Sequence, residues 1–453
     1  MRVLLVSCYE LGHQPLGVAG PAGRLRAAGH EVRTLDLSIE PWEASCLEWP
    51  ERVACSVPMH TATRLARQVI ADVRRLRPEI PVACYGLYGA AMTDAAHFAV
   101  AGETDEALLA WVEGTDDSGG PVVHLNRDAA RPGAPRPARE LLPTLDRYSR
   151  LLRGGSEQLV ASTEASRGCV HRCRHCPVPV VYDGRIRVVA LDAVLADVEQ
   201  QVAAGAEHLT FADPDFLNGV AHSRRVVDAV HTRFPDLTFD CTVKVEHVLA
   251  HPEIWSEFAA AGCLFIVSAF ESVDDATLHR LDKGHTVADE ATAVGLLRVH
   301  GIEVRPSWLP FTPWTTLAQV QALLDFVAGH DLVGNVDPVQ YTIRLLLPPG
   351  SLLLDHPDVV PYLDGYDPER ASHTWRSADP TMDDLQRELS AVVEAQLAAG
   401  ESTVAVYQQA RAVVGLDPVA VDERKAGLVP RLSEPWFCCA EPTAAQLAPL
   451  TAR

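Results

Sequence analysis

Residues 166–177 read Ser-Arg-Gly-Cys-Val-His-Arg-Cys-Arg-His-Cys-Pro, and this stretch carries the strongest indication of both fold and chemistry. Cys169, Cys173 and Cys176 fall within eight residues, in the spacing Cys-x3-Cys-x2-Cys. One short loop can turn three thiols toward a single point, and thiolates suit soft metals and iron–sulfur clusters. Three such ligands on a four-iron cluster leave one iron open to a further ligand.

Two other interpretations of these cysteines require different surroundings. A structural zinc ion takes four ligands, and His171 or His175 could supply the fourth. A disulfide framework is typical of small secreted proteins and does not suit a long α/β chain. The spacing, and the position directly after an expected strand at 158–166, favour the iron–sulfur cluster.

The composition narrows the class of protein. With 453 residues and 47% hydrophobic content, the chain is long enough for two or three domains with real cores. A net charge of −21 argues against nucleic acid as the main partner, because phosphate contacts need basic patches. The sequence shows neither a long apolar run nor a signal peptide, so we expect no membrane span and a cytoplasmic location.

Five of the eleven cysteines stand singly in apolar segments. Free cysteine in a reducing compartment usually behaves as a small buried hydrophobe. We therefore expect inert core positions for Cys8, Cys55, Cys84, Cys241 and Cys263.

Residues 1–115 alternate short apolar strands with helices, among them expected helices at 22–29 and 62–78. This alternation predicts a doubly wound, Rossmann-like parallel sheet. Residues 116–157 are rich in Gly, Pro, Asp and Arg, which indicates a linker. The expected strands of the first domain cover residues 1–8, 30–37, 52–59 and 80–89, with a further short one from residue 97.

Residues 158–350 alternate again and predict a partial (β/α)6 TIM barrel. In such barrels the chemistry lies at the carboxyl ends of the strands. Residues 351–453 are expected to be mainly helical, with an irregular tail. The expected barrel strands are 158–166, 208–212, 237–243, 263–269, 302–308 and 339–345, and the helices between them are 191–204, 221–233, 252–261, 274–281, 287–299 and 316–329.

With the cysteine loop placed after the first barrel strand, residues 158–350 resemble the radical S-adenosylmethionine (radical SAM) superfamily. The resemblance implies that Cys169, Cys173 and Cys176 hold a [4Fe-4S] cluster. The amino and carboxylate groups of SAM would bind the open iron, and an electron from the cluster would cleave a carbon–sulfur bond of SAM. It also implies a small-molecule substrate and a cellular electron donor of the flavodoxin or ferredoxin type.

The resemblance suggests cofactor-binding residues in and after the cysteine loop. His175 occupies the aromatic position before the third cysteine and would pack near the adenine. Asp213 and Asp215 stand in place of the family's Gly-Gly-Glu segment, which holds the methionyl amine. They depart from that pattern, and an acidic helix-capping turn is the alternative interpretation.

Further candidates follow the later barrel strands. Lys244 comes after the third strand, and Ser268 and Glu271 come at the end of the fourth, where the family often contacts the SAM ribose. Arg305 lies on the fifth expected strand and Arg344 on the sixth. An inward arginine there could bind a carboxylate through two hydrogen bonds, or it could form a structural ion pair.

Residues 1–115 resemble the cobalamin-binding-like domain that precedes many radical SAM barrels, in the opening strand and the Pro15-Leu16-Gly17 loop. The Asp-x-His-x-x-Gly motif that ligates cobalamin is absent, and His13, His30 and His60 are expected on the surface or in loops. Either cobalamin binds without a protein ligand, or the domain has lost it and serves as a scaffold. The missing motif favours the loss.

The tail contains Trp-Phe-Cys-Cys-Ala-Glu-Pro at 436–442. Two adjacent thiols form a soft pair that could bind a metalloid or form a strained disulfide, whereas inert packing beside the aromatic residues is the alternative. This segment resembles the CUAEP/CCAEP-tail radical SAM proteins, and the layout is similar to radical SAM enzymes of arsinothricin biosynthesis. The resemblance implies that Cys438 and Cys439 are catalytic and present thiol-bound arsenic to a radical.

Three functions follow from these observations. The first is a radical SAM enzyme that modifies a small molecule, with transfer of the 3-amino-3-carboxypropyl group of SAM to arsenic or another heteroatom. The second is a cobalamin-dependent radical SAM methylase. The third is a cysteine-based metal or metalloid sensor without catalysis.

Overall fold

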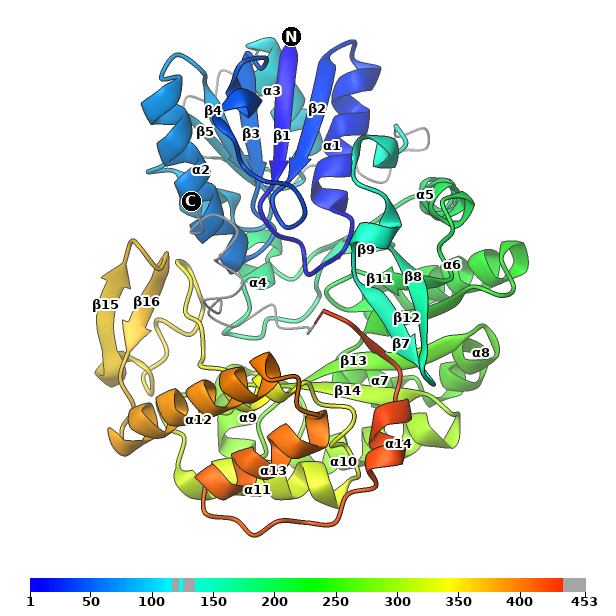
Figure 1. The fold of residues 1–453 in the computed structure, drawn as a ribbon, viewed down its shortest axis with the longest axis vertical. Helices are drawn as coiled ribbons and strands as arrows, with labels where there is room; N and C mark the ends of the chain where they lie inside the picture. Colours follow the sequence, from blue (N-terminus) through cyan, green and yellow to red (C-terminus); the bar gives the residue numbers. More distant parts are fainter. Residues whose placement is uncertain (116–121, 125–134, 435–453) are drawn as a thin grey trace.

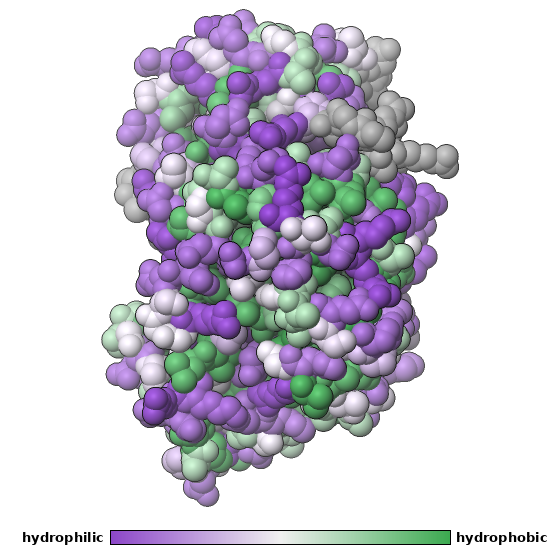
Figure 2. Space-filling view, turned by 90° about the vertical axis from the view of Figure 1, so that its right-hand side faces the viewer, coloured by the Kyte–Doolittle hydropathy of each residue, from purple (hydrophilic) through white to green (hydrophobic). Residues whose placement is uncertain are grey.

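The computed structural model describes residues 1–115, 122–124 and 135–434. Figure 1 shows a sheet with its helices at the amino-terminal end, a second and strongly curved sheet below it, and a layer of carboxyl-terminal helices beyond. In Figure 2 polar side chains cover most of one face, with apolar ones in small groups. Among the described helices, none has the length and hydropathy to cross a bilayer.

The amino-terminal sheet has six parallel strands in the order β2-β1-β3-β4-β5-β6. Its central strands are short apolar runs buried on both faces, as parallel strands between helices require. Cys8, Cys55 and Cys84 are at most 1% exposed, which confirms their expected burial. The strands are β1 (Arg2–Ser7), β2 (Glu31–Asp36), β3 (Arg52–Ser56), β4 (Val82–Tyr85), β5 (Phe98–Gly102) and β6 (Val122–His124).

Helices cover both faces of this sheet. α1 (Leu16–Ala27) and α3 (Asp105–Glu113) pack on one face, and α2 (His60–Leu76) packs on the other. α1 begins six residues before the predicted helix, because the Glu10 carboxylate accepts hydrogen bonds from the Leu16 and Gly17 amides and so caps its first turn. The surface or loop position expected for His60 is wrong, since this residue lies buried in the first turn of α2.

The second sheet has seven strands in the order β14-β13-β12-β11-β8-β7-β17. Five of them are parallel and form a curled half-barrel, whereas β7 and β17 extend it in antiparallel fashion. The first five predicted barrel strands are confirmed. The strands are β7 (Arg150–Arg153), β8 (Ser156–Thr163), β11 (His208–Phe211), β12 (Thr238–Thr242), β13 (Cys263–Glu271), β14 (Glu303–Trp308) and β17 (Arg431–Leu432).

Helices alternate with these strands close to their predicted bounds. The predicted helix 252–261 divides into a 3-10 turn and a shorter helix, α8. Cys241 and Cys263 lie in the core of this half-barrel, as expected. The helices are α5 (Leu191–Ala203), α6 (Val220–Arg233), α7 (Val245–Ala250), α8 (Trp255–Ala260), α9 (Asp275–Leu281), α10 (Val287–Val299) and α11 (Leu317–Gly329).

The predicted sixth barrel strand at 339–345 is wrong. Residues Pro338–Tyr341 form a 3-10 helix, and a single bridge between Phe311 and Arg344 is the remaining strand-like contact. The Gln340 side chain accepts the backbone N–H of Trp308, 3.0 Å away, and so takes a hydrogen bond that a sixth strand would have taken. The barrel therefore ends at β14.

The region after the barrel is helical, but it also contains strands. α12 (Thr381–Ala398), α13 (Thr403–Val413) and α14 (Glu423–Leu428) follow a hairpin of β15 (Leu363–Asp367) and β16 (Ser372–Trp375), which the sequence did not indicate. The chain then returns to the half-barrel, where β17 pairs with β7.

A buried arginine joins the two halves of the molecule. Arg139 lies in the stretch predicted as a linker, and its guanidinium bonds both carboxylate oxygens of Asp197 on α5, at 3.1 and 2.9 Å. It also donates to the carbonyl of Gln14 before α1 (2.8 Å) and to that of Ser162 on β8 (2.6 Å). Arg139 and Asp197 are 5% and 2% exposed, so this ion pair is shielded from water.

Replacing Arg139 should destabilise the protein strongly. Arg139→Met leaves the Asp197 carboxylate buried without its cation, which costs about 3–5 kcal/mol. Arg26→Met removes an exposed ion pair with Glu140 and should cost less than about 1 kcal/mol. Urea unfolding of both variants measures the difference, and equal midpoints would contradict a joining role for Arg139.

Candidate functional site

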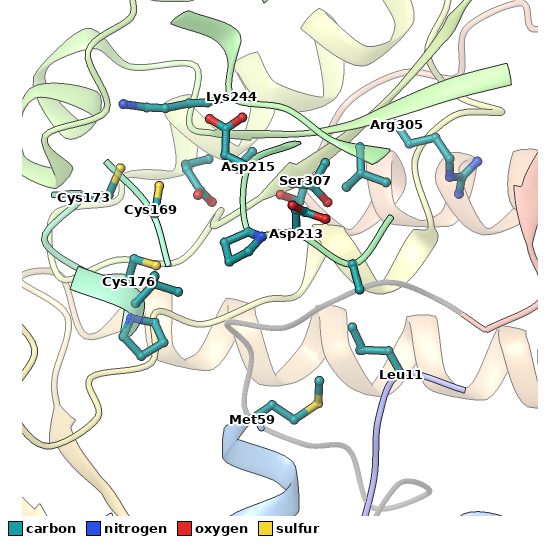
Figure 3. A pocket seen from close by; sticks show the side chains of 18 of the residues that line it. Leu11, Met59, Cys169, Cys173, Cys176, Asp213, Asp215, Lys244, Arg305 and Ser307 are labelled. Carbon is teal, nitrogen blue, oxygen red and sulfur yellow. The ribbon is translucent and has the colours of Figure 1, made fainter. Parts of the chain in front are cut away.

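A cavity lies between the carboxyl ends of the amino-terminal strands and the mouth of the half-barrel (Figure 3). Leu11 and Met59, from the loops after β1 and β3, form one side of it. The three cysteines and several charged residues lie on the opposite side. The space is about 1700 Å³ when the open solvent at its mouth is included.

The cysteine loop is anchored at its first residues. It follows β9 (Ser166–Gly168) and ends at α4 (Val178–Tyr182). Gly168 has a φ of +79°, and a Cβ there would lie 2.3 Å from the Arg185 carbonyl oxygen, so only glycine fits. The Asn218 side chain donates to the Gly168 carbonyl (3.3 Å) and accepts from the Val170 amide (3.1 Å).

Cys169, Cys173 and Cys176 all line the cavity, as Figure 3 shows. Burial, with a contribution from Asp215, raises the pKa of the Cys169 thiol to about 11. A bound metal is therefore needed to hold this residue as a thiolate at neutral pH.

The arrangement of the cysteines favours a cluster over a single ion. Three sulfurs bound to one zinc at 2.3 Å lie within about 4.6 Å of one another. Among the described residues, one group of three metal-ligating atoms falls within 4.8 Å, and it contains no cysteine. The two histidines that could supply a fourth zinc ligand face carboxylates instead: His171 faces Asp215, and His175 faces Glu271. The donor set thus fits a multi-iron cluster.

His175 belongs to a buried charged group. Its Nε2 lies 3.1 Å from Glu271 Oε1, and the same oxygen accepts from the Lys283 ammonium at 3.1 Å. Burial alone would raise the pKa of Glu271, but Lys283 and His175 hold it at about 2. Burial would lower the pKa of Lys283, yet Glu271 and the cluster cysteines raise it. A charged pair therefore faces the cavity beside the cysteines.

Asp213 and Asp215 both lie in the cavity wall but make different contacts. Asp213 accepts from the Ala165 amide (2.9 Å) and the Ser166 hydroxyl (2.6 Å), and burial raises its pKa to about 7. Asp215 caps the turn at 216–219 through one oxygen. Asp213 thus fixes the strand that enters the cysteine loop, and the capping interpretation holds for Asp215.

Of the remaining site residues predicted from the sequence, two line the cavity and two do not. Lys244 and Arg305 line the cavity, where they pair with Glu246 at 3.0 Å and with Asp337 at 2.8 Å. Ser268 donates to the Val243 carbonyl and is not part of the cavity wall. Arg344 stacks on Trp375, 3.6 Å from the ring centre, and pairs with Asp383 away from the cavity.

Cys438 and Cys439 lie outside the described residues. The last described segment, however, ends at the cavity, where Leu432 and Glu434 form part of the wall. The Tyr9 hydroxyl donates to Glu434 Oε1 at 2.6 Å, which ties this segment to the loop after β1.

Sequence reasoning missed Lys283, Asn218 and His247. Lys283 and Asn218 lie in turns without periodicity, and their partners Glu271 and Gly168 are 12 and 50 residues away. His247 lies on the short helix α7 after β12, a position that the strand-end rule could have drawn attention to.

Residues 163–327 match the sequence family described as the radical SAM superfamily. Among curated proteins, the hopanoid C-3 methylase of Methylococcus capsulatus (strain ATCC 33009 / NCIMB 11132 / Bath) is 23% identical over 326 residues. The match covers 66% of this chain and 62% of that protein.

Two solved structures share the fold. The cobalamin-dependent radical SAM enzyme OxsB with aqua-cobalamin bound superimposes with a TM-score of 0.66 at 13% identity, covering 87% of this chain and 67% of OxsB. The radical SAM methyltransferase TsrM from Kitasatospora setae, with tryptophan and a SAM analogue bound, gives a TM-score of 0.56 at 23% identity. That match covers 73% of this chain and 71% of TsrM.

Loss of two loop cysteines should abolish cluster binding. Cys173→Ala/Cys176→Ala removes two thiolates, so iron after anaerobic reconstitution should fall from about four atoms per chain to below one. Cys46→Ala, in the 3-10 turn at 44–47, should keep the parent iron content. Iron analysis and visible absorbance measure both, and retention of four irons in the double variant would refute the assignment.

Proposed function

This chain is an enzyme of the radical SAM superfamily, and we propose that it methylates a small organic molecule with cobalamin bound between its two halves. It uses a [4Fe-4S] cluster and SAM, and it requires an electron donor, for which we propose a flavodoxin or ferredoxin. Because the chain is an enzyme, we reject the hypothesis of a cysteine-based metal or metalloid sensor without catalysis.

The position of the cavity supports this proposal. Open parallel sheets bind ligands at the carboxyl ends of their strands, where the strand order reverses direction. In the order β2-β1-β3 this point lies between the loops that follow β1 and β3. Leu11, His13, Pro58 and Met59 belong to these two loops, and all four line the cavity. A cofactor held there would face the cysteine loop.

The relatives support methyl transfer. The curated relative is named a methylase, and TsrM is described as a methyltransferase. The chain spans 62% of the length of the hopanoid methylase, so its substrate does not follow from that match.

The cavity wall suits cobalamin without a histidine ligation motif. Leu11, Met59, Leu87 and Tyr88 give an extended apolar surface against which a large planar ring can pack. Burial lowers the pKa of His13 to about 4, so a neutral imidazole joins them. Bound there, cobalamin supplies a metal that can carry a methyl group.

On the barrel side, we assign cluster binding to Cys169, Cys173 and Cys176. Lys244 and the Glu271–Lys283 pair offer opposite charges to the amino and carboxylate groups of SAM. Arg305, on the far side of the cavity in Figure 3, offers a guanidinium to a substrate anion.

A bulky residue in the apolar wall tests this cofactor site. Met59→Trp should reduce cobalamin binding at least about 10-fold, because the indole occupies the space of the ring, and leave the iron content unchanged. Val299→Trp, at a position 81% exposed, is the control. Corrinoid absorbance after reconstitution and gel filtration gives the occupancy. Undiminished cobalamin in Met59→Trp, or none in the parent protein, would refute the site.

The carboxyl-terminal segment favours a second candidate, transfer of the 3-amino-3-carboxypropyl group of SAM to thiol-bound arsenic. Glu434 lies in the cavity wall, and Cys438 follows four residues later, within about 14 Å of extended chain. Cys438 and Cys439 are thus within reach of the cavity.

The product formed from SAM separates the two reactions. Methyl transfer leaves S-adenosylhomocysteine, whereas transfer of the aminocarboxypropyl group leaves 5′-methylthioadenosine. We expect S-adenosylhomocysteine from anaerobic incubation of the cobalamin-loaded enzyme with SAM and a reductant, measured by mass spectrometry. Methylthioadenosine that depends on arsenite and disappears in Cys438→Ser/Cys439→Ser would instead support the second reaction.

A further inference from the structure

A second group of metal-ligating atoms lies beside the cysteine loop. His171 Nε2, Asp215 Oδ2 and His247 Nδ1 all fall within 4.8 Å of one another. The Asp215 oxygen is 2.8 Å from the His247 nitrogen and 3.4 Å from the His171 nitrogen. Three separate elements supply these residues: the cysteine loop, the turn after β11 and helix α7.

Asp215 lies at ion-pair distance from both histidines, but the three atoms form no hydrogen bond of normal geometry with the residues that the structure describes. Each is buried, and none has a donor or acceptor in bonding geometry among the described residues, although the separations are short. Asp215 is 2% exposed, and its other oxygen is used in capping the Leu217 amide. Buried polar atoms without partners are rare and costly, so their convergence on one point indicates a missing ligand.

We propose that His171, Asp215 and His247 bind a divalent first-row transition metal ion, separate from the iron–sulfur cluster. Two imidazoles and one carboxylate are a donor set for ions such as Zn²⁺ and Fe²⁺. Ligand atoms at 2.0–2.1 Å from one ion are at most about 4.2 Å apart, and the two contacts of Asp215, at 2.8 and 3.4 Å, meet this limit. The histidine pair, within 4.8 Å, needs at most a small ring rotation.

The surroundings provide a second shell for this ion. The other nitrogen of His171, Nδ1, lies 3.6 Å from the Glu246 carboxylate and 3.2 Å from the Lys244 ammonium. In this geometry Nδ1 accepts from the Lys244 ammonium; a metal on Nε2 would place a proton on Nδ1, which would then donate to the Glu246 carboxylate in place of that contact. Lys244 keeps its ion pair with Glu246 at 3.0 Å and offsets the charge of that carboxylate.

The site differs from a closed structural zinc site. Three protein ligands leave at least one coordination position for water or substrate, as in catalytic metal sites. His171 and Asp215 also line the cavity, so the ion lies at its wall, beside Lys244 and the cysteines in Figure 3. An oxygen or nitrogen of a molecule in the cavity could therefore bind it directly.

Zinc binding to the cluster-loaded enzyme tests this proposal. The protein is reconstituted to about four irons per chain, so that the cysteines are occupied, and titrated anaerobically with Zn²⁺ against a fluorescent chelator. We expect one zinc per chain. His247→Ala should weaken binding by more than about 100-fold, since loss of a second-shell group alone costs 10–100-fold. Its iron content should remain that of the parent, because His247 lies outside the cysteine loop.

His251→Ala is the matched control. His251 follows α7, and its ring lies 6.1 Å from that of His247, but it supplies no atom to the group. Its zinc affinity should equal that of the parent. Zinc X-ray absorption should show nitrogen and oxygen neighbours at 2.0–2.1 Å and no sulfur at 2.3 Å. The proposal is overturned by a sulfur shell, by equal affinities of His247→Ala and the parent, or by no zinc uptake at all.

Discussion

The buried guanidinium of Arg139 holds the two walls of the cavity at a fixed separation. It bonds the carbonyl of Gln14, next to the cavity residue His13, and the carbonyl of Ser162, near the end of β8. Asp197 supplies the charge that makes burial of this arginine tolerable. Because one rigid planar group contacts both halves, the loop after β1 and the strand before the cysteine loop cannot shift independently. The space between them, and any ligand bound in it, depends on this contact.

A second contact acts on the cysteine loop itself. Glu103, just after β5, lies 3.1 Å from the Arg167 guanidinium and accepts a hydrogen bond from the Tyr182 hydroxyl. Arg167 and Tyr182 flank the cysteines on either side, in β9 and α4. Burial raises the pKa of Glu103, and Arg167 opposes this shift. The amino-terminal sheet thus supports the loop that we assign to the cluster, which is a structural role independent of the proposed cobalamin binding.

The confirmed predictions concern features that depend on residues close together in the sequence. The first five barrel strands follow from apolar runs, and the cysteine spacing pointed to the cluster loop. The prediction of a sixth strand failed because the Gln340 side chain accepts the Trp308 N–H. Hydrophobic periodicity cannot show that a side chain replaces a strand in this hydrogen bond. The same limit applies to the site. The sequence suggests an inward strand position for Arg344, but in the structure this residue pairs with Asp383. Lys283 lines the cavity from a turn that shows no hydrophobic periodicity. These outcomes depend on contacts between residues distant in sequence.

The charges in the cavity indicate which kind of ligand it suits. Lys244, Lys283 and Arg305 all line it, although the whole chain carries a net charge of −21. Each cation already has a carboxylate beside it, namely Glu246, Glu271 and Asp337 respectively. At the buried Glu271–Lys283 pair, a ligand with a single charge would leave one member of the pair without a partner away from water, which is costly. A zwitterion can instead exchange with both members at once. The methionyl ammonium and carboxylate of SAM form such a pair, whereas the adjacent sulfonium adds one positive charge that this exchange does not balance.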